Sequence, residues 1–139
     1  MNELTIYLKR SFNKRVLLDT GIVIDFLAGE PKAKSFFEEH VFSGQLTPAI
    51  SSQTVSELFM ATRNKKEETE LDQWLSKVFE RVDVTYDIAK NAGLIKRSNG
   101  VRVGDIFIAA TAITLGIPLV TTTPEAYRRV DVKTFRPYA

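Results

Sequence analysis

The chain has 139 residues, of which 44% are hydrophobic and 26% charged, which suits one globular domain with a real core. Its net charge of +2 and pI near 8.9 permit an acidic partner without requiring one. The absence of cysteine excludes a disulfide framework, a thiolate zinc site and a cysteine nucleophile. No segment approaches the roughly 20 apolar residues of a membrane span, and the start does not look like a signal peptide. We therefore expect a soluble, cytoplasmic protein that does not use a membrane.

The first residues stand apart from the patterns that follow them. Leu4, Ile6 and Leu8 alternate with more polar neighbours, which is typical of a strand. The alternation fits an added edge strand or an arm on a second subunit, and a disordered start is equally compatible. We expect residues 1–14 to form an N-terminal extension and residues 15–139 a single domain.

The first predicted strand ends on a carboxylate. Residues 16–19 form a buried strand in this prediction, and Asp19 closes it directly after three apolar residues. A helix is expected over 21–28, and Pro31 separates it from a second helix over 32–41. An ionised carboxylate in apolar company is costly unless it is paired or binds a metal. Asp19 is therefore a candidate site residue, although it would also serve as a turn former after the strand.

The second predicted strand is followed by another acidic residue. Residues 47–51 fit a short strand with its proline near the start, where a missing N–H is tolerated. Ser51 and Ser52 are suited to cap the next helix, which carries Glu57. Glu57 is a candidate site residue, although a helical glutamate often only faces water. A polar helix with one apolar stripe is expected over 66–79.

The last third of the chain contains an apolar helix that begins with an acid. Asp105 opens a helix over 105–115, and Gly116 is placed to cap its end. The helix dipole favours a negative charge in the first turn, so Asp105 has a structural interpretation beside the functional one. Four further elements are expected around this helix: a strand over 82–85, a helix over 86–98, and strands over 117–121 and 130–135.

Strands that alternate with helices predict an α/β fold, in which a central parallel sheet of four to five strands has helices on both faces. Ligands of such sheets bind outside the carboxyl ends of the strands. We therefore expect Asp19, Glu57 and Asp105 to reach one edge of the sheet. Three carboxylates there would make an oxygen-ligand site for a hard cation such as Mg²⁺ or Mn²⁺. This pattern indicates a small metal-dependent nuclease.

Four segments of the chain combine the candidate residues with their neighbours. They are Asp19-Thr20-Gly21 continuing to Leu27, Ser56-Glu57-Leu58, Asp105 continuing to Ala112, and Leu119 continuing to Tyr127. In this order they resemble the motifs of PIN-domain ribonucleases, whose fourth motif also usually ends in an aromatic residue. The resemblance spans about residues 15–135, and the chain length resembles that of VapC-type toxins from prokaryotic toxin–antitoxin pairs.

The resemblance implies a three-layer, PIN-like α/β/α fold and Mg²⁺- or Mn²⁺-dependent cleavage of RNA, which leaves 5′-phosphate ends. It implies that Asp19, Glu57 and Asp105 are both the catalytic residues and the metal ligands. It also implies a homodimer and a cognate antitoxin protein. Three hydroxyl side chains are expected to support the site, although a β-favouring threonine is equally well explained by structure. They are Thr20, Thr121 and Thr123.

The chain departs from the family pattern at two positions. Gly21 stands where Asn or Ser is usual, and Thr123 stands where a fourth acidic or amide residue is expected. Because a hydroxyl is a poorer Mg²⁺ ligand than a carboxylate, Glu125 is a candidate substitute. A catalytically weak PIN domain that binds RNA or protein is thus an alternative. A receiver-like signalling domain is a third class, disfavoured because paired acids near the first strand are missing.

Basic side chains near the four segments are candidates for phosphate contacts, which would position RNA without reading its sequence. A solvated helix face explains any single one of them equally well, so no RNA-binding residue is singled out. His40 is the only histidine, which excludes a mechanism that uses two histidines. The basic candidates are Arg63, Lys65, Lys66, Lys96, Arg97, Arg102, Arg128 and Arg129.

Overall fold

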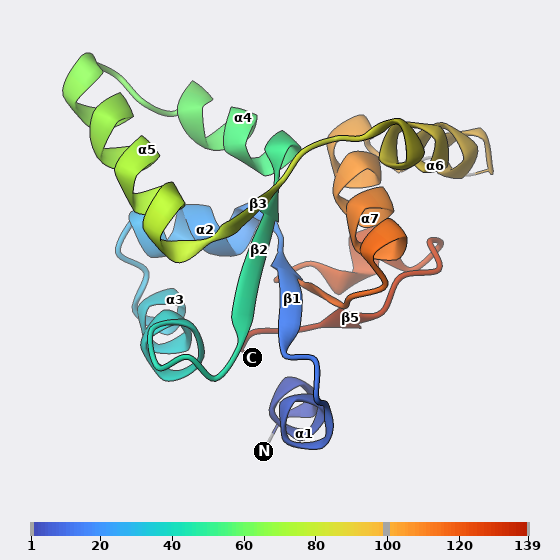
Figure 1. The fold of residues 1–139 in the computed structure, drawn as a ribbon, viewed down its shortest axis with the longest axis horizontal. Helices are drawn as coiled ribbons and strands as arrows, with labels where there is room; N and C mark the ends of the chain where they lie inside the picture. Colours follow the sequence, from blue (N-terminus) through green and yellow to red (C-terminus); the bar gives the residue numbers. More distant parts are fainter. Residues whose placement is uncertain (1, 99–100, 139) are drawn as a thin grey trace.

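The computed structural model describes residues 2–98 and 101–138. In this part of the chain, five strands form one all-parallel sheet in the order β3-β2-β1-β4-β5 (Figure 1). The predicted α/β fold with a central parallel sheet is confirmed. The strands are β1 (Arg15–Leu18), β2 (Thr47–Ser51), β3 (Glu80–Val82), β4 (Leu119–Val120) and β5 (Thr134–Phe135).

Helices cover both faces of the sheet. In Figure 1, α2 to α5 lie on one side of the strands, and α6 and α7 lie on the other. Within the described ranges, no helix is both long enough and apolar enough to cross a bilayer. The helices are α1 (Glu3–Arg10), α2 (Thr20–Leu27), α3 (Pro31–Phe36), the π-helix η1 (Phe37–Val41), α4 (Ser52–Met60), α5 (Lys65–Val78), α6 (Tyr86–Ser98), α7 (Val103–Leu115) and the 3₁₀-helix η2 (Pro124–Tyr127).

Strand β1 explains why the first apolar run is continuous rather than alternating. Val16 and Leu18 pack into the larger apolar cluster with α2 to α5, whereas Leu17 packs into a second cluster with α7. Successive strand residues point to opposite faces, so a strand covered on both faces needs apolar residues throughout. The next residue, Asp19, consequently emerges at the carboxyl edge of a central strand.

Residues 3–10 form helix α1, so the prediction of an edge strand was wrong. Asn2 caps this helix, because its Oδ1 accepts a hydrogen bond from the Thr5 N–H at 2.9 Å. Leu4 and Leu8 lie one turn apart and are buried in the larger cluster, while Ile6 is exposed. Leucines four residues apart fit one face of a helix as well as alternate positions of a strand. The capping residue Asn2 is the signal in the sequence that distinguishes the helix from the strand.

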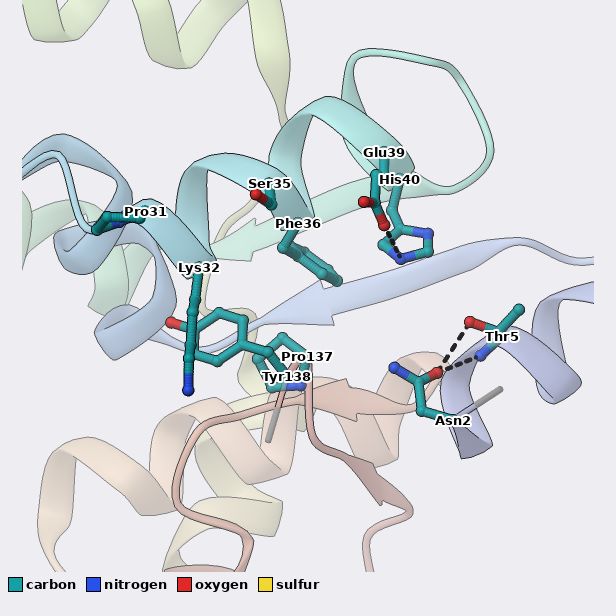
Figure 2. A pocket seen from close by; sticks show the side chains of 10 residues that line it. All are labelled: Asn2, Thr5, Pro31, Lys32, Ser35, Phe36, Glu39, His40, Pro137 and Tyr138. Atoms are coloured by element: carbon teal, nitrogen blue, oxygen red, sulfur yellow. Dashed lines mark hydrogen bonds and ion pairs between the residues drawn. The ribbon is translucent and has the colours of Figure 1, made fainter.

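The start of α1 and the C-terminal segment border a hollow of about 640 Å³ beside α3 and η1 (Figure 2). We call it the terminal hollow. Its wall includes Asn2, Phe36, His40 and Tyr138. It is thus built from segments that flank the sheet rather than from the ends of the central strands.

Most predicted elements lie within two residues of their observed bounds, but several besides α1 differ in kind or position. β5 begins at Thr134 rather than at residue 130. β3 begins at Glu80 rather than at residue 82, and Glu80 forms an ion pair with Arg15 of β1. The helix expected over 32–41 ends in the π-helix η1, and η2 was not predicted. The predicted C-cap is confirmed, because Gly116 adopts a left-handed φ of 67°.

Candidate active site

The sheet order places a crevice at the carboxyl ends of β1 and β4. The chain leaves β1 to form β2 on one side of it, and returns later to form β4 on the other side. Ligands of open parallel sheets bind at such a switch point. Asp19 directly follows β1 and is the N-cap of α2, and Thr121 directly follows β4. Two of the predicted site residues therefore meet there.

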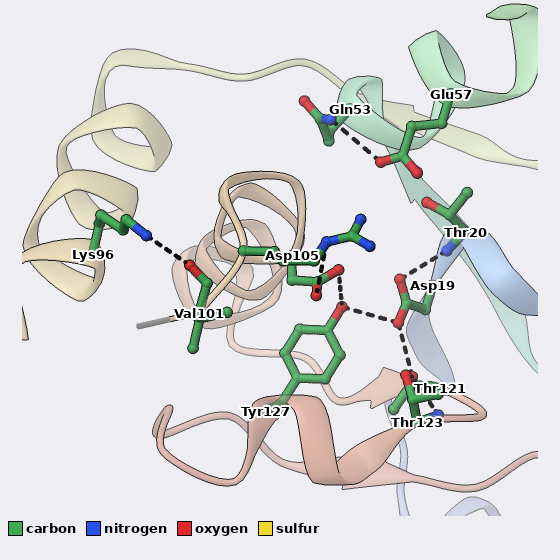
Figure 3. Close-up of polar contacts among 11 residues, drawn as sticks. Asp19, Thr20, Gln53, Glu57, Lys96, Val101, Asp105, Thr121, Thr123 and Tyr127 are labelled. Carbon is green, nitrogen blue, oxygen red and sulfur yellow. Dashed lines mark hydrogen bonds and ion pairs between the residues drawn. The ribbon is translucent and has the colours of Figure 1, made fainter. Parts of the chain in front are cut away.

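The carboxylate of Asp19 is held in one orientation by three donors. Its Oδ1 accepts from the Thr20 N–H at 2.8 Å. Its Oδ2 accepts from the Thr121 hydroxyl at 2.8 Å and from the Tyr127 hydroxyl at 2.9 Å. Asp19 is only 8% exposed, so few other arrangements are available to it. Both oxygens are satisfied within a site that remains open to the cleft (Figure 3).

Tyr127 connects Asp19 to the second carboxylate, Asp105. Its hydroxyl lies 3.4 Å from Oδ1 of Asp105, and its side chain is 1% exposed. Burial raises the pKa of Tyr127 far above its usual value, and the two carboxylates raise it further. The phenol thus stays protonated, and its single proton lies between two acids. Figure 3 shows the hydroxyl pointing at both of them.

Asp105 lies in the first turn of α7, as the sequence predicted. Its Oδ2 is 3.8 Å from Nε of Arg102, an exposed side chain at the mouth of the site. Burial raises the pKa of Asp105; the Arg102 charge opposes this shift and the Asp19 charge adds to it. The carboxylates of Asp19 and Asp105, which both contact the Tyr127 hydroxyl, therefore repel each other. A cation between them would relieve that repulsion.

Glu57 faces the same cleft from α4. Its Oε1 accepts a hydrogen bond from Nε2 of Gln53 at 3.3 Å. A Cβ at Gly104 would lie 3.4 Å from that Oε1, so the Glu57 carboxylate rests against the first turn of α7. Glu57 is thereby brought next to the helix start that carries Asp105, on the opposite wall from Tyr127 (Figure 3).

The three acids line one cleft of about 640 Å³, which we call the carboxylate cleft. Thr20 lines it, and its hydroxyl is 2.9 Å from that of Thr54, which ties α2 to α4. Thr123 lines it as well, and its N–H donates to the Thr121 hydroxyl at 3.1 Å. All three predicted supporting threonines therefore lie at the site, with Thr121 in direct contact with an acid.

Only some of the basic candidates lie at this cleft. Arg102 and Arg128 line it. Arg63 borders a different hollow beside α5, where it pairs with Glu67. The side chain of Arg97 falls outside the described part of the chain. Arg129 borders a smaller hollow, which Arg128 also lines. The remaining candidates lie elsewhere: Lys65 and Lys66 on α5 and Lys96 on α6.

Comparisons with known proteins agree with this geometry. Residues 16–133 match the PIN domain family. The chain is 34% identical over 111 residues to Ribonuclease VapC19 of Mycobacterium tuberculosis, a match covering 76% of this chain and 86% of that protein. The chain belongs to the VapC ribonucleases of the PIN-domain family. The family and the type of enzyme predicted from the four segments are confirmed.

Solved structures of similar fold include toxin–antitoxin assemblies. A toxin-antitoxin complex from Klebsiella pneumoniae contains a chain that is 25% identical, with a TM-score of 0.75 over 88% of this chain and 98% of that one. VapBC-1 from nontypeable Haemophilus influenzae matches at 23% identity, with a TM-score of 0.71 over 88% and 98%. The second match, at its lower identity, shows the shared fold alone.

VapC proteins typically depend on a divalent metal, and the donor set of the carboxylate cleft fits one. Its acids offer only oxygen, which suits Mg²⁺ or Mn²⁺. Asp19 and Asp105 share the Tyr127 hydroxyl, so their oxygens face one small volume. Across residues 2–98 and 101–138, no cluster of three or more acids, histidines or cysteines is arranged to hold a metal. Asp19 and Asp105 thus meet at the Tyr127 hydroxyl, and Glu57 lines the same cleft from α4.

Tyr127 is the residue whose role sequence reasoning missed in this VapC chain. Its position appeared only as the aromatic end of the fourth segment. A usable signal was present, because a buried tyrosine needs a partner for its hydroxyl and the nearby motifs supply two acids. The 3₁₀-helix η2, which turns Tyr127 inward, begins with Pro124, a residue suited to the first position of a helix.

Proposed function

We propose that this VapC protein is a metal-dependent endoribonuclease and the toxin of a VapBC-type pair, with Asp19, Glu57 and Asp105 as its catalytic acids. One observation carries the proposal: Asp19 and Asp105 both accept from the hydroxyl of Tyr127, at the switch point of the sheet. Acids that repel each other at an open cleft are well suited to a cation and to the phosphate that the cation would attract.

The acids and the groups around them have separate roles in this proposal. Asp19, Asp105 and Glu57 would hold the Mg²⁺ or Mn²⁺ ion, and Tyr127 with Thr121 keeps Asp19 in its orientation. When bound, the cation would offset charge that develops on the attacked phosphate and would make water more acidic. Glu57, on the facing wall, would accept the proton of the attacking water when it is not occupied as a ligand.

Two arginines complete the proposed reaction site. Arg102 and Arg128 line the carboxylate cleft with exposed side chains. A guanidinium can donate two parallel hydrogen bonds to a phosphate, which makes it suitable for holding a strand near the acids. These contacts address the RNA backbone, so they position the substrate without selecting a sequence.

The partner expectations follow from the same family. The Klebsiella pneumoniae structure is a toxin-antitoxin complex, which supports an antitoxin partner for this chain. We also propose that the free protein is a homodimer. Light scattering on the purified protein tests that point, since a monomeric mass would contradict it.

Cleavage of a labelled RNA in the presence of Mn²⁺ tests the proposed reaction. Asp105→Asn keeps an oxygen acceptor for Tyr127 but removes a ligand charge, so we expect activity to fall at least about 100-fold. The matched control is Asp72→Asn on the exposed side of α5, which should cleave like the wild type. Products should carry 5′-phosphate ends. An Asp105→Asn protein that is folded and equally active would overturn the assignment.

The alternative function is a catalytically weak PIN domain that binds RNA or protein. Thr123 favours it, because this exposed hydroxyl lines the cleft where the family usually has an acidic or amide group. The nearby candidate substitute, Glu125, forms an ion pair with Arg136 at 3.1 Å. Metal-bound wild type that holds RNA without cutting it would favour this alternative.

A further inference from the structure

A second, smaller hollow lies next to the carboxylate cleft, at η2 and the residues that follow it. It measures about 200 Å³ and is lined by Val101, Glu125, Ala126, Arg128 and Arg129. We call it the arginine hollow. Glu125, Ala126 and Arg128 line both hollows, so the two spaces share a wall and a ligand can extend from one into the other.

The charge of the arginine hollow is positive despite the acid in its wall. Glu125 is neutralised by Arg136, whose Nη2 lies 3.1 Å from Oε2 of the glutamate. Arg136 is itself anchored, because its Nη1 donates to the carbonyl of Thr122 at 3.0 Å. Arg128 and Arg129 are both exposed, and neither has an ion-pair partner among the described residues. Two guanidinium groups are therefore available to an anion.

The size of the arginine hollow limits what it can hold. Ligand pockets for drug-sized molecules are typically about 300–1,000 Å³, and this hollow is smaller. It is much larger than the roughly 30 Å³ that one water molecule occupies in the liquid. A tetrahedral phosphate group fits between these limits, and guanidinium groups bind phosphate with good geometry.

We propose that the arginine hollow binds a backbone phosphate of single-stranded RNA next to the phosphate that is cut. This inference rests on the proposed function. Arg129 is the residue that distinguishes this subsite, since it lines the arginine hollow but not the carboxylate cleft. The contact is to phosphate alone, so it contributes affinity and register on the strand but no base preference.

Binding measured without metal separates this subsite from the chemistry. Fluorescence anisotropy of a labelled 12-nucleotide single-stranded RNA in EDTA, over a range of salt concentrations, gives both affinity and its salt dependence. We expect Arg129→Ala to bind roughly tenfold more weakly, as for one charge-assisted hydrogen bond. The slope of log affinity against log salt should become shallower by about 0.7, the value for one phosphate contact on a single strand.

Two controls make the result specific. Arg81→Ala removes an exposed arginine from β3, away from both hollows, and should leave affinity and slope unchanged. Arg129→Lys should bind RNA more tightly than Arg129→Ala but less tightly than the wild type. Lysine keeps the positive charge but cannot donate the two parallel hydrogen bonds of a guanidinium. A labelled 12-residue polyglutamate peptide, measured alongside, reports on an acidic protein segment as the occupant.

Each outcome decides between the claims. If wild type binds RNA and Arg129→Ala matches Arg81→Ala, the phosphate subsite is wrong while the proposed ribonuclease function stands. If Arg129→Ala weakens RNA and polyglutamate equally, the hollow recognises acidic chains in general and the inference is overturned. If wild type neither binds nor cleaves RNA, both the proposed function and the phosphate subsite are wrong.

Discussion

Two hollows of this VapC protein have the same volume, about 640 Å³, but very different walls. In the terminal hollow, Asn2 bonds to Thr5 of the same helix at 2.9 Å (Figure 2), and Tyr138 donates to a single acid, Asp25, at 3.1 Å. In the carboxylate cleft, acids from distant segments converge instead. Size therefore does not identify the site here, whereas convergence of like charges at strand ends does.

Each hollow has a tyrosine at its wall or next to it that bonds to an aspartate. Tyr138 lines the terminal hollow, and Tyr127 contacts the acids of the carboxylate cleft. Burial and the bond to Asp25 raise the pKa of Tyr138 to about 12, and Tyr127 is shifted further in the same direction. Both phenols are thus neutral donors, but only Tyr127 touches the acids proposed to bind metal. Replacing each of these tyrosines by phenylalanine therefore tests the same substitution in two environments.

Of the changes that compare the two hollows, Tyr127→Phe is expected to have the largest effect. This change removes the donor that sets Asp19 and Asp105 at one position, so Mn²⁺ affinity should fall about 10- to 100-fold, the usual cost of losing a partner that orients a metal ligand. Calorimetric titration with Mn²⁺ measures it. Tyr138→Phe is the control and should bind Mn²⁺ like the wild type. Equal affinities for the two variants would mean that Tyr127 does not position the acids.

Thr123→Asp would extend the carboxylate cleft by one acid. Thr123 is exposed and lines the cleft, so an added carboxylate there can face the metal without being buried. We expect Mn²⁺ affinity and RNA cleavage to rise by roughly five- to tenfold, because ligand charge tunes the affinity for hard cations. Steady-state cleavage rates at limiting Mn²⁺ report it. An unchanged rate would count against the alternative of a catalytically weak PIN domain.

Asn2→Ala should affect stability but not the metal site. It removes the N-cap of α1, whose Oδ1 accepts from the Thr5 N–H at 2.9 Å, at an expected cost of about 0.5–2 kcal/mol. Urea unfolding measures the loss. Mn²⁺ affinity of the folded variant should equal that of the wild type, and a parallel loss of metal binding would show that the two regions are coupled.

The smallest expected effect is a pH dependence of stability that comes from Asp105. Its pKa is raised in the folded protein, so the folded state binds this proton more tightly than the unfolded state. Metal-free wild type should therefore lose stability as pH rises from the unfolded pKa through the raised folded one. Asp105→Asn should be the more stable protein at neutral pH in EDTA, and its advantage should shrink toward about pH 4. Thermal unfolding measures this; a destabilised variant at neutral pH would contradict it.

The sequence predicted the parts of this protein that follow from local pattern and from parallel-sheet geometry. Apolar runs and caps located most elements. Because the carboxyl ends of parallel strands meet at one edge of a sheet, Asp19 was expected near Thr121, and the two are in contact. The sequence did not predict α1, since Leu4 and Leu8 fit two periodicities equally well. It did not predict the Tyr127 bridge either. That contact depends on how η2 turns after β4, which is set by packing between segments distant in sequence.

The sequence could predict the edge of the sheet at which the three acids emerge, but not the direction of each side chain. Order along the sheet places Glu57 at the same edge as Asp19 and Asp105, which the structure bears out at the level of one cleft. The side chain of Glu57 is instead engaged by Gln53 of its own helix. A motif gives the edge at which a side chain emerges, but its final direction depends on neighbours that the motif does not include.

Calorimetric titration of the metal-free protein with Mn²⁺, comparing wild type with Asp19→Asn, tests the central claim most directly. We expect saturable binding by the wild type and its loss in the variant, because Asp19 is the acid that Tyr127, Thr121 and Thr20 jointly orient. Binding of the same affinity in a folded Asp19→Asn protein would contradict it and place the metal elsewhere.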